Sequence, residues 1–225
     1  MISIIKDWNP KQKKLNELLS DSKSFLDGIS LCCELHYQVH DILAQEKELT
    51  IYQKLINDLP AEAITFRPKN HFSSIAWNIW HITRIEDAVS NILINDSKQI
   101  IFNRINKLNT KTIDTGNAFS ERDIDEFNSS INVKELLKYR KAVGENTQGI
   151  LATLTNEDRK TRPTQDQLNR ILSEGVLTKE KDSIWLLDFW GKKTISGLLT
   201  MPLTRHQIMH ISDCFKIRER YEKYA

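Results

Sequence analysis

Six histidines stand out in the sequence, because five of them fall on the predicted inward faces of long helices. The six are His36, His40, His71, His81, His206 and His210. Only His71 lies in a predicted loop. His206 and His210 are four residues apart on one helix, so both rings project from the same face. Imidazole nitrogens at this spacing can bind one divalent metal ion, at bond lengths of about 2.0–2.1 Å.

The residues between this pair exclude one class of metalloenzyme. They are Gln207, Ile208 and Met209, whereas a zincin carries Glu directly after the first histidine as its general base. A metalloprotease of that type is therefore excluded. The alternative to a metal site is a coincidental spacing, with one histidine buried through hydrogen bonds and the other exposed.

A third histidine favours the metal hypothesis. His81 lies on the inward face of another predicted helix, and three histidines from two helices would leave coordination positions open for catalysis or ligand binding. His36 and His40 repeat the four-residue spacing on the first long helix. They could complete the site, orient a substrate or hydrogen-bond to the ligands. The alternative for this pair is a polar patch in the core that is hydrogen-bonded to carboxylates.

Four residues close to His81 complete the candidate site as pocket or supporting residues. Trp77 is a candidate pocket wall, and Asn78 shares the inward stripe of His81. Arg84 and Asp87 follow on the same helix, where Asp87 could orient a ligand or pair with an arginine. The alternative for these two charges is an ordinary surface salt bridge.

Composition restricts the class of protein. The 225 residues include 32 Lys and Arg against 30 Asp and Glu, which gives no electrostatic indication of a nucleic-acid partner. Hydrophobic residues make up 40% of the chain and charged residues 28%, as in ordinary globular proteins. Dinucleotide-binding, P-loop and nucleophile-elbow motifs are absent from the sequence.

The sequence predicts a cytoplasmic protein without a membrane partner. No stretch approaches the 18 to 20 apolar residues, roughly, that span a bilayer, and the first residues do not form a signal peptide. The three cysteines are Cys32, Cys33 and Cys214. An odd number with two adjacent is no disulfide framework and indicates a reducing compartment.

Helical periodicity dominates the chain and predicts an all-α bundle in one domain, residues 1–225. Long helices are expected at about 22–44, 74–95, 132–154 and 203–221. Short helices are expected at about 11–19, 50–59, 121–127 and 167–173. Pro10 is expected at the first helical position before residues 11–19, and Ser73 or Ser74 is expected to cap the helix that carries His81. Residues 184–190 fit either a short helix or a strand.

Three segments together resemble a known family. They are SIAWNIWHITRIED at residues 74–87, RHQIMHI at 205–211 and LHYQVH at 35–40. In order and spacing they resemble the DinB-like (DinB/YfiT-like) metalloenzyme superfamily, and LHYQVH fits one branch of it. The resemblance covers about residues 22–221, and little of it falls in 97–130 or 165–200.

The resemblance implies a four-helix bundle with a long crossover connection and short accessory helices. It also implies a divalent transition metal, with zinc or nickel expected, held by His81, His206 and His210. Members of known activity are S-transferases that use low-molecular-weight thiols and a related isomerase, and several are homodimers. His36 and His40 are additions that such transferases are not expected to need.

Three functions follow as hypotheses. The first is a metal-dependent enzyme acting on a small-molecule substrate, either a thiol S-transferase or a hydrolase in which the metal activates water. The second is a metal or small-ligand binding protein of the stress response without turnover. In the third, the histidines are only hydrogen-bonded core residues. The lack of a Glu beside His206 weighs slightly against hydrolysis.

Overall fold

A computed structural model describes residues 4–41 and 48–224, and it is all-α, with no strand in those ranges. The long helices are α1 (Ile4–Ser20), α2 (Phe25–Gln38), α5 (Ile75–Ala88), α8 (Val133–Leu151) and α12 (His206–Tyr224). The shorter α-helices are α3 (Ile51–Ile56), α4 (Ala61–Thr65), α6 (Ile105–Leu108), α7 (Glu121–Ser130), α9 (Gln165–Ser173), α10 (Lys181–Gly191) and α11 (Ile195–Thr200). The all-α prediction is confirmed.

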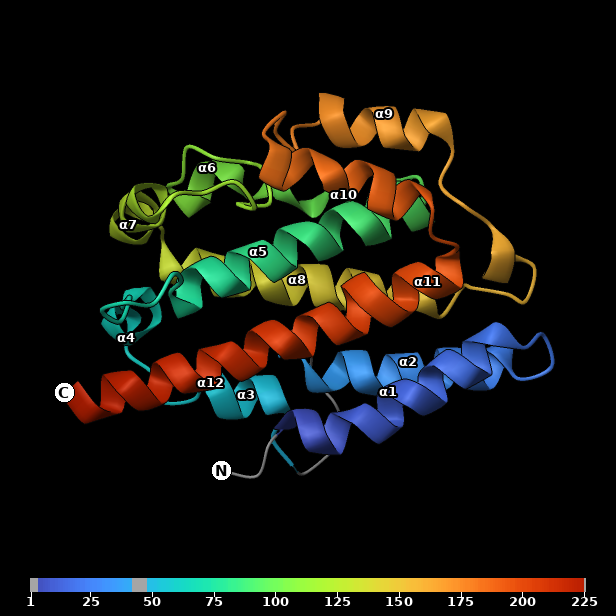
Figure 1. Ribbon diagram of the computed structural model, residues 1–225, viewed down its shortest axis with the longest axis horizontal. Coiled ribbons are helices and arrows are strands. Elements are labelled where there is room, and N and C mark those ends of the chain that lie inside the picture. Colours follow the sequence, from blue (N-terminus) through green and yellow to red (C-terminus); the bar gives the residue numbers. More distant parts are fainter. Residues whose placement is uncertain (1–3, 42–47, 225) are drawn as a thin grey trace.

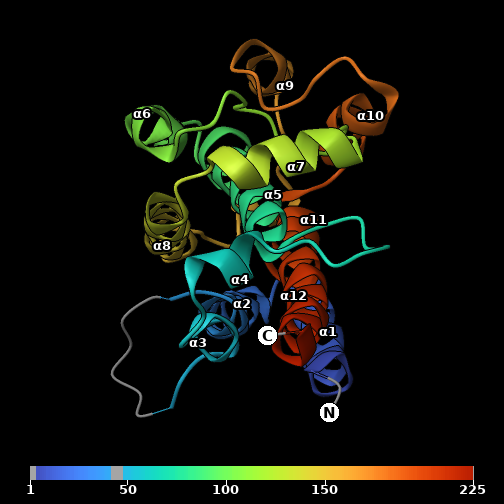
Figure 2. The same cartoon turned by 90° about the vertical axis from the view of Figure 1, so that its left-hand side faces the viewer.

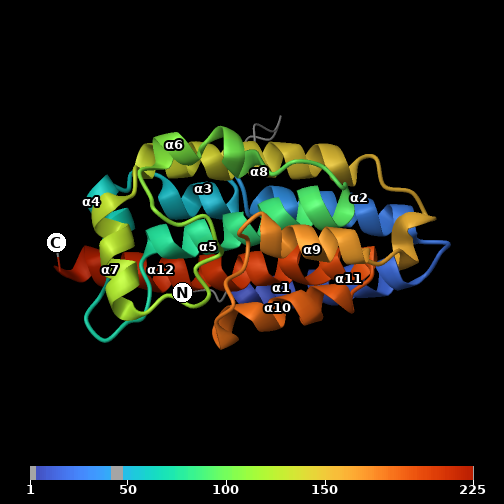
Figure 3. The ribbon, with the colours of Figure 1, turned by 90° about the horizontal axis from the view of Figure 1, so that it is seen from above.

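Helix α5 lies at the centre of the bundle. It packs against α8 and α12, and α2 packs against α1 and α8 (Figure 1). The end-on view shows α6, α7, α9 and α10 gathered on one side of α5, with α1, α2 and α3 on the other (Figure 2). Seen from above, the long helices run side by side along the same axis (Figure 3). Helices far apart in the sequence therefore face one another across α5.

The central position of α5 explains a difference from the sequence pattern. Its periodicity predicts a single inward stripe, but every residue from Ile75 to Ala88 is buried. A helix covered on all sides has no solvent face, so polar residues outside the stripe are buried too. The predicted cap is confirmed, since the Ser74 hydroxyl accepts a hydrogen bond from the amide of Trp77 at 3.0 Å.

Two helices contain a widened turn. Helix α5 continues as a π-helix at Val89–Ile94, and another π-helix, Met201–Arg205, leads directly into α12. The final helix was predicted to begin at about Leu203, whereas its regular α-helical part begins at His206. Single π-helical turns are frequent at functional sites. The π-helix Met201–Arg205 ends directly before His206.

The N-terminal helix corrects a prediction. Pro10 lies inside α1 and not at its first position, because the helix begins at Ile4. Pro10 lacks an amide hydrogen, so the helix loses one backbone bond there. Within the helix the indole of Trp8 donates to Gln12 at 2.8 Å, and Gln12 ties the helix to the carbonyl of Thr200 at 2.8 Å.

Helix α2 is shorter than predicted. It ends at Gln38, and the amides of Val39 and His40 donate to the carbonyls of His36 and Tyr37, which tightens the last turn. His40 therefore follows the helix and does not lie within it. The remainder of the predicted helix, residues 42–44, lies outside the described residues.

Two further segments, at residues 184–190 and 50–65, contain helices. The sequence left residues 184–190 as either a short helix or a strand. They lie in α10 and are therefore helical. The helix predicted at about 50–59 is α3, and Pro60 caps the separate helix α4. In the described part of the chain, no helix is both long and apolar enough to cross a membrane.

Candidate metal centre

The fold brings His81 from α5 together with His206 and His210 from α12. The Nε2 atoms of His81 and His206 are 3.3 Å apart. The ring centroids of His210 lie 4.7 Å from His81 and 4.5 Å from His206. One potential ligand atom from each histidine lies within 4.8 Å of the other two. The three residues thus form a compact group, to which we refer as the three-histidine cluster.

A loop carbonyl fixes the orientation of His81. Its Nδ1 donates a hydrogen bond to the carbonyl of Thr115 at 2.8 Å. A carbonyl can only accept, so the ring proton of neutral His81 is on Nδ1 and Nε2 carries a free lone pair. The carbonyl is itself held in place, because the amide of Thr115 donates to Val176 at 3.0 Å.

Asn78 fixes His210 in the same way. The Asn78 amide nitrogen donates to the Ser74 carbonyl at 2.7 Å and to the Ser73 hydroxyl at 3.0 Å. Its Oδ1 therefore faces His210, whose Nδ1 donates to it at 2.7 Å. The Nε2 of His210 then carries a lone pair. Metal-binding histidines are commonly oriented by such a hydrogen bond from the other ring nitrogen.

The spacing of the cluster fits a bound divalent cation. Tetrahedral ligands at zinc–nitrogen distances of about 2.0–2.1 Å stand roughly 3.4 Å from one another. The Nε2 atoms of His81 and His206 match this separation at 3.3 Å. The Nδ1 atom of His206 is buried and has no hydrogen-bond partner. Unless a cation lies between the two Nε2 atoms, the ring proton of His206 is on Nε2 and donates to the lone pair of His81.

The protonation states suit a metal as well. Burial, followed by the charge of His210, lowers the pKa of His81 to about 3. Burial lowers the pKa of His210 to about 4. For His206, burial and then the two neighbouring histidines and Arg140 hold the pKa well below its usual value. All three imidazoles are neutral near pH 7, which is the form that binds metals.

Aromatic and apolar side chains line one side of the cluster. The indole of Trp77 stacks on His81 with ring centroids 4.8 Å apart and an interplanar angle of 9°. Phe72 packs edge-on against Trp77 at 5.6 Å. Phe72 is 47% exposed, and His206 and His210 are partly exposed. The cluster is therefore accessible from the surface, next to an aromatic wall.

The other histidine pair lies in a different group. His36 and His40 both bond through Nε2 to the carboxylate of Glu86, at 2.7 and 2.9 Å. Arg140 donates to the same carboxylate at 3.0 Å. All four side chains are fully buried, and we call them the Glu86 network. The structure thus places His36 and His40 against a carboxylate and separate from the three-histidine cluster.

Hydrogen bonding in the Glu86 network assigns its protons. Gln148 donates through Nε2 to the carbonyl of Cys33 at 3.0 Å and contacts His36 Nδ1 at 2.9 Å. The Nδ1 of His36 therefore accepts, and its Nε2 hydrogen points at Glu86. Burial alone would raise the pKa of Glu86, but His40, His36 and Arg140 hold it well below its usual value. The ionised carboxylate thus accepts from two imidazoles and a guanidinium, while His40 Nδ1 and Arg140 Nε in the same network are buried without a hydrogen-bond partner.

Arg84 and Asp87 also lie away from the three-histidine cluster. They pair with each other at 3.0 Å and are fully buried, not on the surface. Tyr139 donates to Asp87 at 2.6 Å, and the amides of Ile100 and Ile101 donate to the same carboxylate. This pair ties α5 to α8 and to the segment that follows the first π-helix.

Sequence reasoning missed several residues around the two groups. Glu86, Arg140 and Gln207 lie off the predicted inward stripes, and only a helix buried on all sides places Glu86 in the core. The Thr115 carbonyl carries no side-chain signal. The family features predicted at residues 35–40, 74–87 and 205–211 do include all the histidines of both groups.

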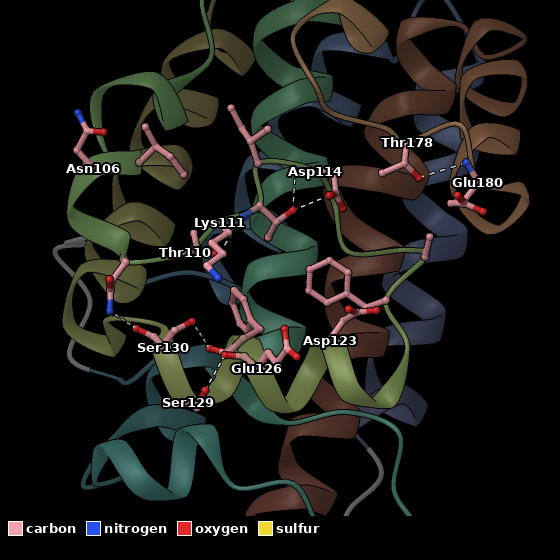
Figure 4. Close-up of a pocket in the computed structure, with 17 residues that line it drawn as sticks. Asn106, Thr110, Lys111, Asp114, Asp123, Glu126, Ser129, Ser130, Thr178 and Glu180 are labelled. Atoms are coloured by element: carbon pink, nitrogen blue, oxygen red, sulfur yellow. Dashed lines mark hydrogen bonds between the residues drawn. The ribbon is translucent and has the colours of Figure 1, made fainter.

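A separate cavity of about 1070 Å³ lies between α6, α7 and the start of α10 (Figure 4). Its wall includes Lys111, Asp114, Asp123, Glu126 and Glu180. The lining contains none of the six histidines. Polar side chains around it are largely bonded to one another, as Thr112 to Asp114 at 2.5 Å.

Comparison with models of protein families identifies the family of the chain. The model of the DinB superfamily matches residues 46–213, more than half of the chain. The chain belongs to the DinB superfamily. The matched segment of this DinB protein contains the three-histidine cluster, Glu86 and Arg140, and it begins after His36 and His40. No curated protein matches the chain.

Proposed function

We propose that the three-histidine cluster binds a divalent transition metal and that this DinB protein is a metal-dependent enzyme of the thiol S-transferase type. The observation that carries the proposal is the separation of 3.3 Å between two Nε2 atoms, in a cluster where Thr115 and Asn78 direct lone pairs inward. Three protein ligands leave at least one position for a substrate.

The donor set supports thiol chemistry over hydrolysis. Three neutral imidazoles leave the full positive charge of a divalent ion in place, and such an ion lowers the pKa of a bound thiol into the neutral range. Among the described residues, no carboxylate joins the three-histidine cluster. A hydrolase that uses a protein carboxylate as its general base would need such a group, so its absence weighs slightly against hydrolysis.

The chain's own residues would orient the second substrate. The wall of Phe72 and Trp77 next to His81 suits an apolar electrophile. In the transfer, a carbon–sulfur bond forms, the bond to the leaving group breaks with its electron pair, and the thiol proton passes to solvent. Substrates of this class are small molecules, and a low-molecular-weight thiol is one of them.

A thiol-consumption assay tests this proposal. The protein is loaded with zinc or nickel and incubated with a low-molecular-weight thiol and an alkyl halide, and the loss of free thiol is followed. We expect consumption above the uncatalysed rate in the wild type and the uncatalysed rate in His81→Ala. His71→Ala is the matched control, because it removes a histidine outside the cluster. Equal rates in wild type and His81→Ala would overturn the transferase proposal.

A further inference from the structure

The residue after His206 connects the two groups described above. Gln207 is fully buried and uses its whole carboxamide. Its Oε1 accepts a hydrogen bond from Arg140 at 2.7 Å. Its Nε2 donates to the carbonyls of Ile82 at 3.2 Å and Pro202 at 3.1 Å. A buried amide with every group bonded has little freedom to move.

The partners of Gln207 lie next to the proposed ligands. Ile82 directly follows His81 on α5, and Gln207 directly follows His206 on α12. Apart from the contacts of the histidines themselves, this is the hydrogen bond that joins α5 to α12 in the described ranges. It therefore sets how closely the backbone of one ligand approaches the backbone of the other.

The bond to Pro202 adds control of rotation. Pro202 lies in the π-helix Met201–Arg205, which ends where α12 begins. A widened turn at this point determines the direction in which the first side chain of α12 projects. By donating to the Pro202 carbonyl, Gln207 holds that turn and with it the direction of the His206 ring.

The Glu86 network anchors Gln207 from the other side. Arg140 bonds through Nη1 to Glu86 at 3.0 Å and through Nη2 to the Val39 carbonyl at 2.8 Å and to Gln207. Glu86 in turn is held by His36 and His40. A fixed, planar guanidinium can direct the carboxamide more tightly than a flexible ammonium could.

We infer that Gln207 is a positioning residue, which transmits the rigidity of the Glu86 network to the separation and orientation of His81 and His206. This inference rests on the proposed metal centre. It gives His36 and His40 a role without placing them on the metal: they hold the carboxylate that holds Arg140, which holds Gln207.

Cobalt(II) binding tests the inference, because the ligand-field spectrum of bound cobalt reports coordination geometry and competition with a chelator reports the Kd. The variant is Gln207→Met, which keeps the length of the side chain and removes all three hydrogen bonds. We expect the Kd for Co²⁺ to rise by about 10- to 100-fold, as for other residues that orient metal ligands, and the spectrum to change.

The matched control is Gln148→Met at the far end of the Glu86 network. It removes the bonds to Cys33 and His36 but leaves the contacts of His36, His40 and Arg140 with Glu86, so the connection from Glu86 through Arg140 to Gln207 stays in place. We expect it to lower the melting temperature of the metal-free protein while leaving the Kd and spectrum as in wild type. A purely structural role for Gln207 would give the two variants the same pattern, with stability lowered and Co²⁺ binding unchanged.

Should Gln207→Met fail to fold, Arg140→Lys is read in the same way. It keeps a positive charge beside Glu86 but gives up the forked contact with Gln207 and Val39, so a weaker Kd and an altered spectrum are again expected. Wild-type Kd and spectrum in the folded variant overturn the inference about Gln207. Absence of Co²⁺ binding by the wild type overturns the proposed metal centre itself.

Discussion

The two histidine groups of this DinB protein share one sequence spacing but meet different partners on α5. His206 and His210 meet His81 on α5, whereas His36 and His40 meet Glu86 on the same helix. In the first group the closest nitrogens are 3.3 Å apart, the spacing of metal ligands. In the second the contacts of 2.7 and 2.9 Å are hydrogen-bond distances. By spacing alone either group could hold a metal ion, so what distinguishes them is the residue on α5, a histidine in the first and a carboxylate in the second.

Charge and access separate the two groups further. The three-histidine cluster has no carboxylate and is partly open to solvent. The Glu86 network is fully buried and already contains a cation, the guanidinium of Arg140. A divalent ion placed there would be repelled by Arg140 and would need the Nε2 proton of His36 to leave. Two histidines four residues apart on a helix therefore indicate a polar site. The residue that faces them on the neighbouring helix, here His81 or Glu86, determines whether that site is neutral or contains a buried charge.

The largest effect on stability is expected from breaking the Glu86 network. In Glu86→Gln, Arg140 stays buried without its counter-charge, and the new amide group faces imidazole donors. We expect a loss of about 3–5 kcal/mol in the free energy of unfolding, measured by urea denaturation of the metal-free protein. Glu126→Gln is the control, since its partner Arg122 is exposed and such pairs contribute little. Equal effects of the two substitutions would contradict the role given to the network.

A smaller effect is expected from a pair of glycines on α8. A Cβ on Gly144 would collide with the ring of His40, whereas a Cβ on Gly149 meets nothing within 4 Å. We expect Gly144→Ala to cost about 1–3 kcal/mol of unfolding free energy, because His40 must leave Glu86. Gly149→Ala should stabilise the helix by about 0.5–1 kcal/mol. The changes in melting temperature of the two variants should have opposite signs.

A third effect is expected in the dependence of stability on pH. Burial, followed by Arg140, lowers the pKa of His40 from 6.5 to about 3, so the unfolded chain binds a proton that the folded protein does not. Its contribution is therefore complete above pH 6.5 and is lost as the pH falls towards 3. Between these values, His40→Asn should reduce the slope of unfolding free energy against pH by about 1.4 kcal/mol per pH unit. A slope equal to that of the wild type would contradict the buried, neutral state of His40.

The sequence predicted the helices well, because they depend on local periodicity, and the structure brings His81, His206 and His210 together. Their role as metal ligands stays a prediction. Ser74 is a cap and His81 shares a face with Asn78 in the structure as in the pattern. What the pattern could not predict depends on tertiary contacts. Gln12 ties α1 to the Thr200 carbonyl, and Thr50 donates to the carbonyl of His40 just after α2 has ended.

The Glu86 network was the least predictable part of the site. An amphipathic pattern assigns one inward face to a helix, and α5 has no outward face. Glu86 was therefore not recognised as the partner of His36 and His40, although a carboxylate-bonded polar patch was one of the interpretations of that pair. Gln207 was read only as the residue that replaces a zincin glutamate, whereas its structural partners lie on α5 and α8.

The central claim is that one histidine group binds metal and the other does not. Elemental analysis of untagged wild type, His206→Ala and His40→Ala, each incubated with zinc and then desalted, tests it most directly. We expect about one metal ion per chain in the wild type, loss of the ion in His206→Ala and retention in His40→Ala. Stoichiometric metal in His206→Ala, or its loss in folded His40→Ala alone, would contradict the assignment.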